Sequence, residues 1–237
     1  MNIKRFVCNA YAENCYVVSS GGDCVIIDPG FDHPIGSPGS PASSQKKCSS
    51  VGLPGEPEGA ALEELYNYLD AEGLTPGAIL LTHAHPDHTF GVKPLVERFG
   101  IPVYCSQAGS SAGCPADEHF FCEEAGQPAE PAGTDAAIAG FQVIATPGHT
   151  PDSVCYYNEA EHVLFTGDTL FAGTIGRTDL PGGNYDDEIR SIMEKLIFLP
   201  GETEIFPGHG PTSTIARERV ENPFLEPFNE REEMPEL

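Results

Sequence analysis

The stretch that most constrains this chain is LTHAHPDHTF, which places three histidines and one aspartate within six residues. These potential ligands are His83, His85, Asp87 and His88. They follow the apolar run 78–81, which is typical of a buried strand. So many polar side chains at the end of a buried element are costly unless a ligand pairs with them. The segment therefore predicts metal binding.

The spacing within this stretch favours two metal ions over one. His83 and His85 are two residues apart, so they share a face of an extended chain. Asp87 and His88 follow Pro86, where the chain must turn toward the next helix. An ion such as zinc takes about four ligands, so this segment alone completes neither site.

Three further ligand candidates lie far along the chain, and each follows an apolar run and a glycine. They are His149 after residues 141–145, Asp168 after 163–166 and His209 after 204–206. Ligands at the ends of neighbouring strands converge on one edge of a sheet. The glycines allow the backbone to turn tightly beside an ion. The pattern predicts one site assembled from several strand ends.

The remaining patterns predict a mixed sheet covered by helices, because hairpins come first and strands then alternate with helices. Strands are predicted at 3–7, 15–18, 24–27, 78–81, 103–105, 141–145, 154–157, 163–166 and 204–206. Helices are predicted at 62–69, 92–99 and 189–196. The length of 237 residues suits a single domain, 1–237. Residues 34–59 hold five Gly, five Pro and six Ser, which predicts a mobile insertion, and an acidic tail begins at about residue 225.

The charge balance excludes some partners. The chain has 12 basic and 36 acidic residues, a net charge of −24, so its surface repels nucleic acid and anionic membranes. No apolar run reaches the roughly 20 residues of a membrane span. Without an apolar leader the chain is expected to be cytoplasmic, with its eight cysteines reduced.

Four motifs resemble those of the metallo-β-lactamase superfamily. They are THAHPDH, TPGHTPDS, FTGDTLF and FPGHGPT, in this order. The stretch LFAGTIGRTDLPGGN and the segment STIARERVENPFL are similar to small glyoxalase II-type hydrolases. The resemblance implies an α/β fold, an αββα sandwich of two mixed β-sheets flanked by helices, with a site for two metals.

The resemblance also implies a role for each ligand. His83, His85 and His149 would hold the first metal, Asp87, His88 and His209 the second, and Asp168 would bridge them. Members of the family usually carry two divalent metal ions, most often zinc, with iron or manganese as alternatives. The set of nitrogen and oxygen donors fits all three metals.

Such a centre implies a hydrolase of thioesters, similar to hydroxyacylglutathione hydrolase, acting on a small-molecule acyl substrate. Two cations bridged by a hydroxide lower the pKa of water from about 16 toward 7 and hold the nucleophile. Asp87 and Asp168 would be catalytic, since Asp87 can accept the proton of the hydroxide and Asp168 fixes the metal spacing. Thr82 and Asp28 are expected to hydrogen-bond to the ligands.

Arg177 stands out in a chain with few cations. It follows Asp168 by nine positions, inside the stretch that resembles glyoxalase II. One interpretation is contact with a substrate carboxylate, which makes Arg177 a candidate substrate-binding residue. The other is an ion pair with Asp179 that fixes its own loop.

Two other functions remain open. One is a mononuclear iron persulfide dioxygenase on the same scaffold, and the other is a non-catalytic metal-binding scaffold. The complete ligand set favours the hydrolase over both. The acyl group, the thiol carrier and the oligomeric state stay open.

Overall fold

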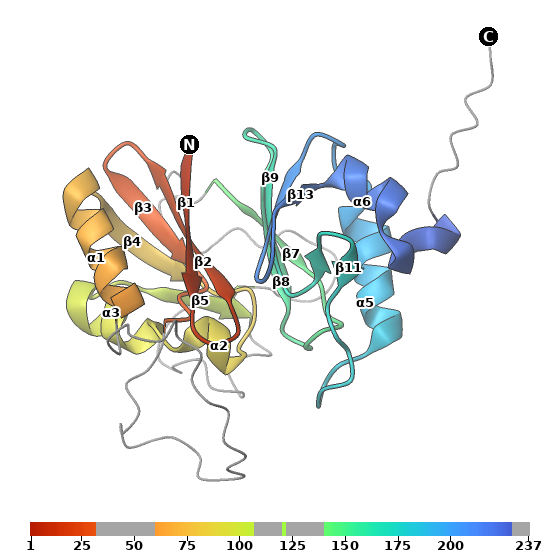
Figure 1. Ribbon diagram of the computed structural model, residues 1–237, viewed down its shortest axis with the longest axis horizontal. Helices are drawn as coiled ribbons and strands as arrows, with labels where there is room; N and C mark the ends of the chain where they lie inside the picture. Colours follow the sequence, from red (N-terminus) through yellow and green to blue (C-terminus); the bar gives the residue numbers. More distant parts are fainter. Residues whose placement is uncertain (32–59, 107–119, 122–139, 229–237) are drawn as a thin grey trace. The chain divides into compact units, whose positions relative to one another are not determined.

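The computed structural model describes residues 1–31, 60–106, 120–121 and 140–228, and Figure 1 shows the course of the chain. The insertion expected at 34–59 lies outside these residues, as do residues 229–237 of the expected tail. The described chain packs as two compact units. Of the described residues, the first contains 1–81 and 85–104, and the second contains 82–84, 105–106 and the chain from 120 onward. The expectation of a single domain stays a prediction.

The first unit is built on strands β1 to β5 of a mixed sheet whose order is β1-β2-β3-β4-β5-β6. The first three strands pair antiparallel and the following pairs are parallel. The strands are β1 (Asn2–Cys8), β2 (Glu13–Ser20), β3 (Asp23–Ile27), β4 (Thr75–Leu80), β5 (Val103–Ser106) and β6 (Phe120–Phe121). Its helices are α1 (Ala60–Glu72), α2 (Pro86–Thr89) and α3 (Val92–Phe99). Leu65 and Leu69 of α1 are fully buried, and Figure 1 shows α1 beside the sheet.

The second unit is built on a mixed sheet in the order β13-β12-β9-β8-β7. Its strands are β7 (Gln142–Ala145), β8 (Val154–Asn158), β9 (Val163–Gly167), β12 (Glu204–Pro207) and β13 (Ser213–Thr214), with a separate hairpin of β10 (Leu170–Phe171) and β11 (Thr174–Ile175). The helical segments are α5 (Tyr185–Ser191), the π-helical turn η2 (Ile192–Leu196), α6 (Ile215–Glu221) and the 3₁₀ segment η3 (Pro223–Phe228). Leu164, Ile192, Leu196 and Ile205 belong to the core between sheet and helices.

Strand direction in the second sheet sets where the ligands lie. β7 is antiparallel to β8, and β8 is antiparallel to β9, so β7 and β9 run the same way. β12 is parallel to β9 and therefore shares this direction. The carboxyl ends of β7, β9 and β12 thus meet at one edge, and each leads within four residues to a ligand candidate, namely His149, Asp168 and His209.

The two mixed sheets with flanking helices confirm the predicted fold class. All nine predicted strands are present, with ends that differ by a few residues. The third helix was predicted as one segment, 189–196, but it begins at Tyr185 and changes to a π-helical turn at Ile192. It begins early because the Asn184 side chain accepts hydrogen bonds from the amides of Asp186 and Asp187. No helix in the described part of the chain is long and apolar enough to span a membrane.

The cysteines only partly follow the expectation of reduced thiols. Cys8, Cys15, Cys24 and Cys155 are buried free thiols. Cys105 on β5 is instead disulfide-bonded, which departs from that expectation.

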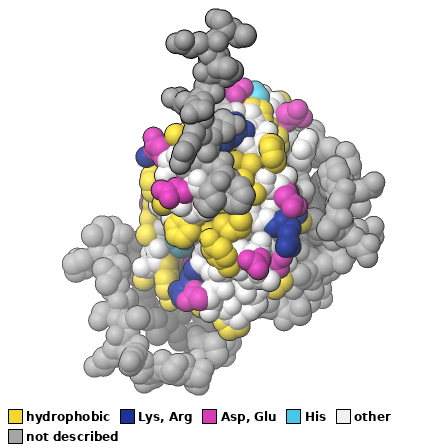
Figure 2. Space-filling model, turned by 90° about the vertical axis from the view of Figure 1, so that its right-hand side faces the viewer, with side chains coloured by type: hydrophobic (Ala, Val, Ile, Leu, Met, Phe, Trp, Pro, Cys, Tyr) yellow, Lys and Arg dark blue, Asp and Glu magenta, His cyan; other side chains and the backbone are white. Residues whose placement is uncertain are grey.

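The surface of the second unit mixes residue types despite the large negative charge. Figure 2 shows a face on which acidic and basic side chains are interspersed and hydrophobic side chains gather near the centre. Among the described residues of this unit, the exposed large hydrophobic ones are Tyr185, Phe198, Val220 and Phe224. The net charge is therefore not concentrated on this face.

The cap of α5 gives a test of the fold. Replacing Asn184 with Ala removes the side chain that accepts two amide hydrogens, so we expect the free energy of unfolding to fall by about 1 kcal/mol in urea titrations. Asn184→Asp keeps an acceptor and should lose less than about 0.5 kcal/mol. Equal stability of wild type and Asn184→Ala would show that the cap does not hold this helix.

Candidate metal centre

The second unit gathers two histidines around one carboxylate oxygen. Asp168 follows β9, and its Oδ2 lies 3.6 Å from Nε2 of His149 and 3.6 Å from Nε2 of His209. The parallel pairing of β9 with β12 explains the closeness of Asp168 and His209, because the two residues follow adjacent strand ends. The predicted convergence of these three residues is confirmed.

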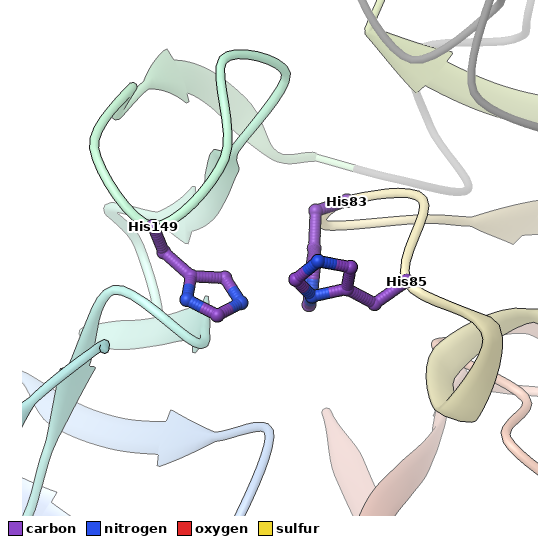
Figure 3. A group of neighbouring side chains, drawn as sticks. All are labelled: His83, His85 and His149. Atoms are coloured by element: carbon purple, nitrogen blue, oxygen red, sulfur yellow. The ribbon is translucent and has the colours of Figure 1, made fainter. Parts of the chain in front are cut away.

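His83 joins the same group through a segment attached to β8. The amide of Val154 donates to the carbonyl of Thr82 at 2.8 Å, and the amide of Ala84 donates to Oδ2 of Asp152 at 2.9 Å. These two bonds hold His83 so that its ring centroid lies 5.0 Å from that of His149. Figure 3 shows the side chains of His83 and His149 beside each other.

His149 is oriented by its other ring nitrogen. Its Nδ1 lies 2.7 Å from the backbone carbonyl of Arg177, and because a carbonyl only accepts, Nδ1 carries the proton. The lone pair is therefore on Nε2, the atom nearest Asp168. A hydrogen bond of this kind fixes both the tautomer and the ring orientation of a metal-binding histidine.

Glu188 contacts the backbone of His149, a contact that no sequence pattern predicts. Its side chain is fully buried, and Oε2 accepts the backbone amide of His149 at 2.8 Å. Burial raises the pKa of Glu188 to about 8, although the amides of His149 and Gly176 act in the opposite direction. In the sequence this residue belongs to an acidic first helical turn, a position that is usually exposed, so no pattern singles it out.

In the first unit, α2 carries the other half of the dense segment. The helix begins at Pro86, as the expected turn requires, and His88 is fully buried on it. Nδ1 of His88 donates to Oδ2 of Asp28 at 3.1 Å, and its Nε2 lies 3.8 Å from Oδ2 of Asp87. The arrangement repeats that of His149, with Nδ1 bound and Nε2 directed at a carboxylate.

The expected hydrogen bonds from Asp28 and Thr82 are both present. Asp28 binds His88, and Oγ1 of Thr82 lies 3.1 Å from Nδ1 of His83. The methyl and hydroxyl of Thr82 also fill the space beside Gly167, where an added Cβ would lie 2.3 Å from Oγ1. Because Gly167 has no side chain, Thr82 can pack directly against the backbone that precedes Asp168.

Glu13 is a second buried acid that the sequence interpretation missed. It lies at the start of β2, is fully buried, and places Oε1 3.9 Å from Nδ1 of His88. Burial raises its pKa well above the usual value, while His88 lowers it. Strand alternation offers no signal for this, because every residue of β2 except Ser20 is buried.

The backbone of Asp87 is tied to the loop that follows β3. The Asn9 side chain donates to the carbonyl of Gly30 at 2.6 Å and to the carbonyl of Asp87 at 2.9 Å. A Cβ on Gly30 would lie 1.9 Å from that Asp87 carbonyl, so only glycine fits there. These contacts fix α2 at its first turn.

The distances fit a metal ion held between these side chains. Ligand atoms about 2.1 Å from a tetrahedral ion lie about 3.4 Å apart. The separations of 3.6 Å from Asp168 to His149 and His209 are close to this value and longer than hydrogen bonds. The predicted set contains five imidazoles and two carboxylates without sulfur, donors that suit zinc, iron or manganese. The assignment of individual residues to two ions stays a prediction.

Arg177 forms the ion pair with Asp179 that was expected as the alternative to substrate binding. Its Nε and one terminal nitrogen donate to the two carboxylate oxygens of Asp179 at 2.8 and 2.9 Å, and both side chains are exposed. Its backbone carbonyl, as described above, orients His149. Contact with a substrate carboxylate stays a prediction.

Comparisons with known proteins show which sequences and structures this chain is similar to. The family model "Metallo-beta-lactamase superfamily" matches residues 8–209. Hydroxyacylglutathione hydrolase GloC of Haemophilus influenzae is 30% identical, over 95% of this chain and 98% of its own length. The crystal structure of the BLEG-1 B3 metallo-beta-lactamase shares 34% identity with a TM-score of 0.68, covering 94% of this chain and 99% of that one. TTHA1623 in a di-iron-bound form shares 34% identity with a TM-score of 0.69, covering 94% and 100%.

The loop that carries His149 depends on Gly148. An added Cβ would lie 2.2 Å from Oε2 and 2.3 Å from Cα of Glu188, and the helix backbone cannot move away easily. We expect Gly148→Ala to lower the free energy of unfolding by about 3 kcal/mol through this overlap.

Gly173 provides the matched control for this substitution. It has a φ of +74° but no neighbour within 4 Å of an added Cβ, so Gly173→Ala should cost only the backbone strain of about 1 kcal/mol. Denaturant titration of both variants measures the difference. Equal losses would contradict a close contact between Gly148 and Glu188.

Proposed function

We propose that this chain, which belongs to the metallo-beta-lactamase superfamily, is the kind of metal-dependent hydrolase that cleaves acyl thioesters. The observation that carries the proposal is the placing of His149 and His209 at 3.6 Å from one oxygen of Asp168. Such a shared carboxylate suits a pair of ions. The thioester class rests on the stretch GRTDLPGG and on the similarity to GloC across nearly the whole chain.

The proposed centre holds two divalent ions. His83, His85 and His149 would bind the first, Asp87, His88 and His209 the second, and Asp168 both. The distances within each unit and the continuity of the chain from His83 to His88 support this division. Zinc is our first expectation, with iron and manganese as alternatives, and the di-iron form of TTHA1623 makes iron a serious one.

When bound, two such ions supply a nucleophile from water near neutral pH and polarise a carbonyl group. The residues of this chain prepare that chemistry. The Arg177 carbonyl accepts the Nδ1 proton of His149, and the Asp28 carboxylate accepts that of His88. The lone pair of each Nε2 therefore stays available for a metal ion. The Asp87 side chain is 21% exposed, and its Oδ2 can accept the proton of the attacking water.

The proposal is tested by metal content and turnover together. We expect purified protein to hold two zinc, iron or manganese ions per chain and to hydrolyse S-lactoylglutathione or another acyl thioester. Asp168→Ala should lower turnover at least about a hundredfold because the ions lose their common ligand. Removal of the ions with a chelator should abolish turnover, and adding them back should restore it.

Controls separate the alternatives in the same assays. Asp186→Asn, an exposed residue on α5, should match the wild type. A metal-replete sample inactive on every thioester would exclude the proposed substrate class, and hydrolysis of β-lactams alone would redirect it toward the activity in the name of BLEG-1. One iron per chain with oxygen uptake on glutathione persulfide would indicate the dioxygenase. Normal cellular function of Asp168→Ala would favour the non-catalytic scaffold.

The role of Arg177 needs its own comparison. If its guanidinium contacts a substrate carboxylate, Arg177→Ala should raise KM about fivefold, as expected for an ion pair of about 1 kcal/mol, and only for thioesters that carry a carboxylate. Arg190→Ala is the matched control, because Arg190 is also exposed and bonded to an aspartate, Asp187. Equal effects on charged and uncharged thioesters would leave the ion pair with Asp179 as the only role of this side chain.

A further inference from the structure

Glu188 is the one buried residue among positions 185–190 of α5. The other acids of this turn, Asp186 and Asp187, are exposed or half-buried, and Asp187 is bonded to Arg190. A carboxylate is an expensive group to bury, and an apolar side chain of similar size would fill the same space. The burial of Glu188 therefore needs a specific explanation in its contacts.

One carboxylate oxygen of Glu188 holds the loop that carries His149. Oε2 accepts the His149 amide at 2.8 Å, and the lack of a side chain on Gly148 allows this approach. The same helical segment binds the loop at further points. The amide of Asn184 donates to the Gly148 carbonyl at 2.8 Å, Ser191 to the Pro147 carbonyl at 2.7 Å and Lys195 to the Ala145 carbonyl at 2.6 Å.

The other carboxylate oxygen faces the loop that carries Asp168. An added Cβ on Gly176 would lie 2.7 Å from Oε1 of Glu188 and 1.9 Å from the carbonyl of Asp168. Gly176 is itself bonded to Thr169 at 3.1 Å, which closes this loop. The carboxyl group of Glu188 thus lies between two loops. One loop carries His149 and the other carries Asp168.

We propose that Glu188 is a positioning residue that fixes His149 relative to Asp168 for metal binding by accepting the His149 amide. The inference rests on the proposed function only in treating His149 and Asp168 as ligands. It makes no use of the thioester chemistry. The hydrogen bond to the amide, rather than the bulk of the side chain, is the feature that matters.

Three substitutions distinguish these properties. Glu188→Gln keeps the length and an oxygen that can accept the His149 amide. Glu188→Leu keeps most of the bulk and removes the acceptor. Glu188→Asp keeps the carboxyl group and withdraws it by one methylene, which breaks the 2.8 Å contact. Asp187→Asn is the control for loss of an acid on the same helix turn.

The readout is binding of Co²⁺ to metal-free protein, followed by its visible absorption spectrum and by competition with a chelator. We expect the wild type, Asp187→Asn and Glu188→Gln to bind two ions with affinities within about threefold of one another. Glu188→Leu and Glu188→Asp should bind one ion about 10–100-fold more weakly, the range seen when a partner of a ligand is lost, with a changed absorption band. Circular dichroism checks that each variant is folded.

Two results would overturn the inference. One is wild-type Co²⁺ affinity and spectrum in folded Glu188→Leu or Glu188→Asp, since Glu188 would then only fill space. The other is equal weakening in Glu188→Gln, because the retained acceptor would not matter. If Glu188→Leu does not fold, the comparison of Gln with Asp decides alone. The expected Co²⁺ pattern without any thioester turnover would support the inference and refute only the proposed function, whereas a wild type that binds no Co²⁺ would refute both.

Discussion

The parallel pairing of β9 with β12 is the constraint on which the centre depends. It places Asp168 and His209 at adjacent strand ends, and two antiparallel steps through β8 bring the end of β7, and with it His149, to the same edge. The sheet therefore brings the starting points of three distant residues together through backbone hydrogen bonds. Loop contacts, such as that of Glu188 with the His149 amide, then set the final positions of the side chains.

Each unit then places a buried acid behind a histidine. Glu188 receives the amide of His149, while Glu13 lies 3.9 Å from Nδ1 of His88. Burying an acid in this way opposes folding, because the charged form loses its solvation and the pKa rises. The two sites differ in kind, however. Glu188 accepts a backbone amide, whereas Glu13 stands beside an imidazole that Asp28 already binds, so only Glu188 has a defined task in holding its ligand.

The sequence predicted the strands and the polar residues that follow their ends well, because both depend on local pattern. Apolar runs followed by glycine and a polar residue mark strand ends. The strands predicted before His149, Asp168 and His209 are all present in the structure. It could not predict Glu188, since a buried acid in an acidic helical turn differs from an exposed one only through the loops packed on it. The same limit applies to α5, where capping by Asn184 moved the start of the helix beyond its apolar repeat. Arg177 was singled out for its side chain, but its backbone carbonyl orients His149. A backbone role of this kind does not depend on residue type, so the sequence could not predict it.

The charge of the chain bears on how it would select a substrate. With 12 basic and 36 acidic residues, the protein repels anions at long range, and the exposed Arg177 is already engaged by Asp179. Bound divalent ions would reverse the sign of the potential locally. An anionic acyl group would then be attracted at the centre itself and not by the surrounding surface. In the proposed centre the metals, more than any single arginine, would therefore recognise negative charge on a substrate.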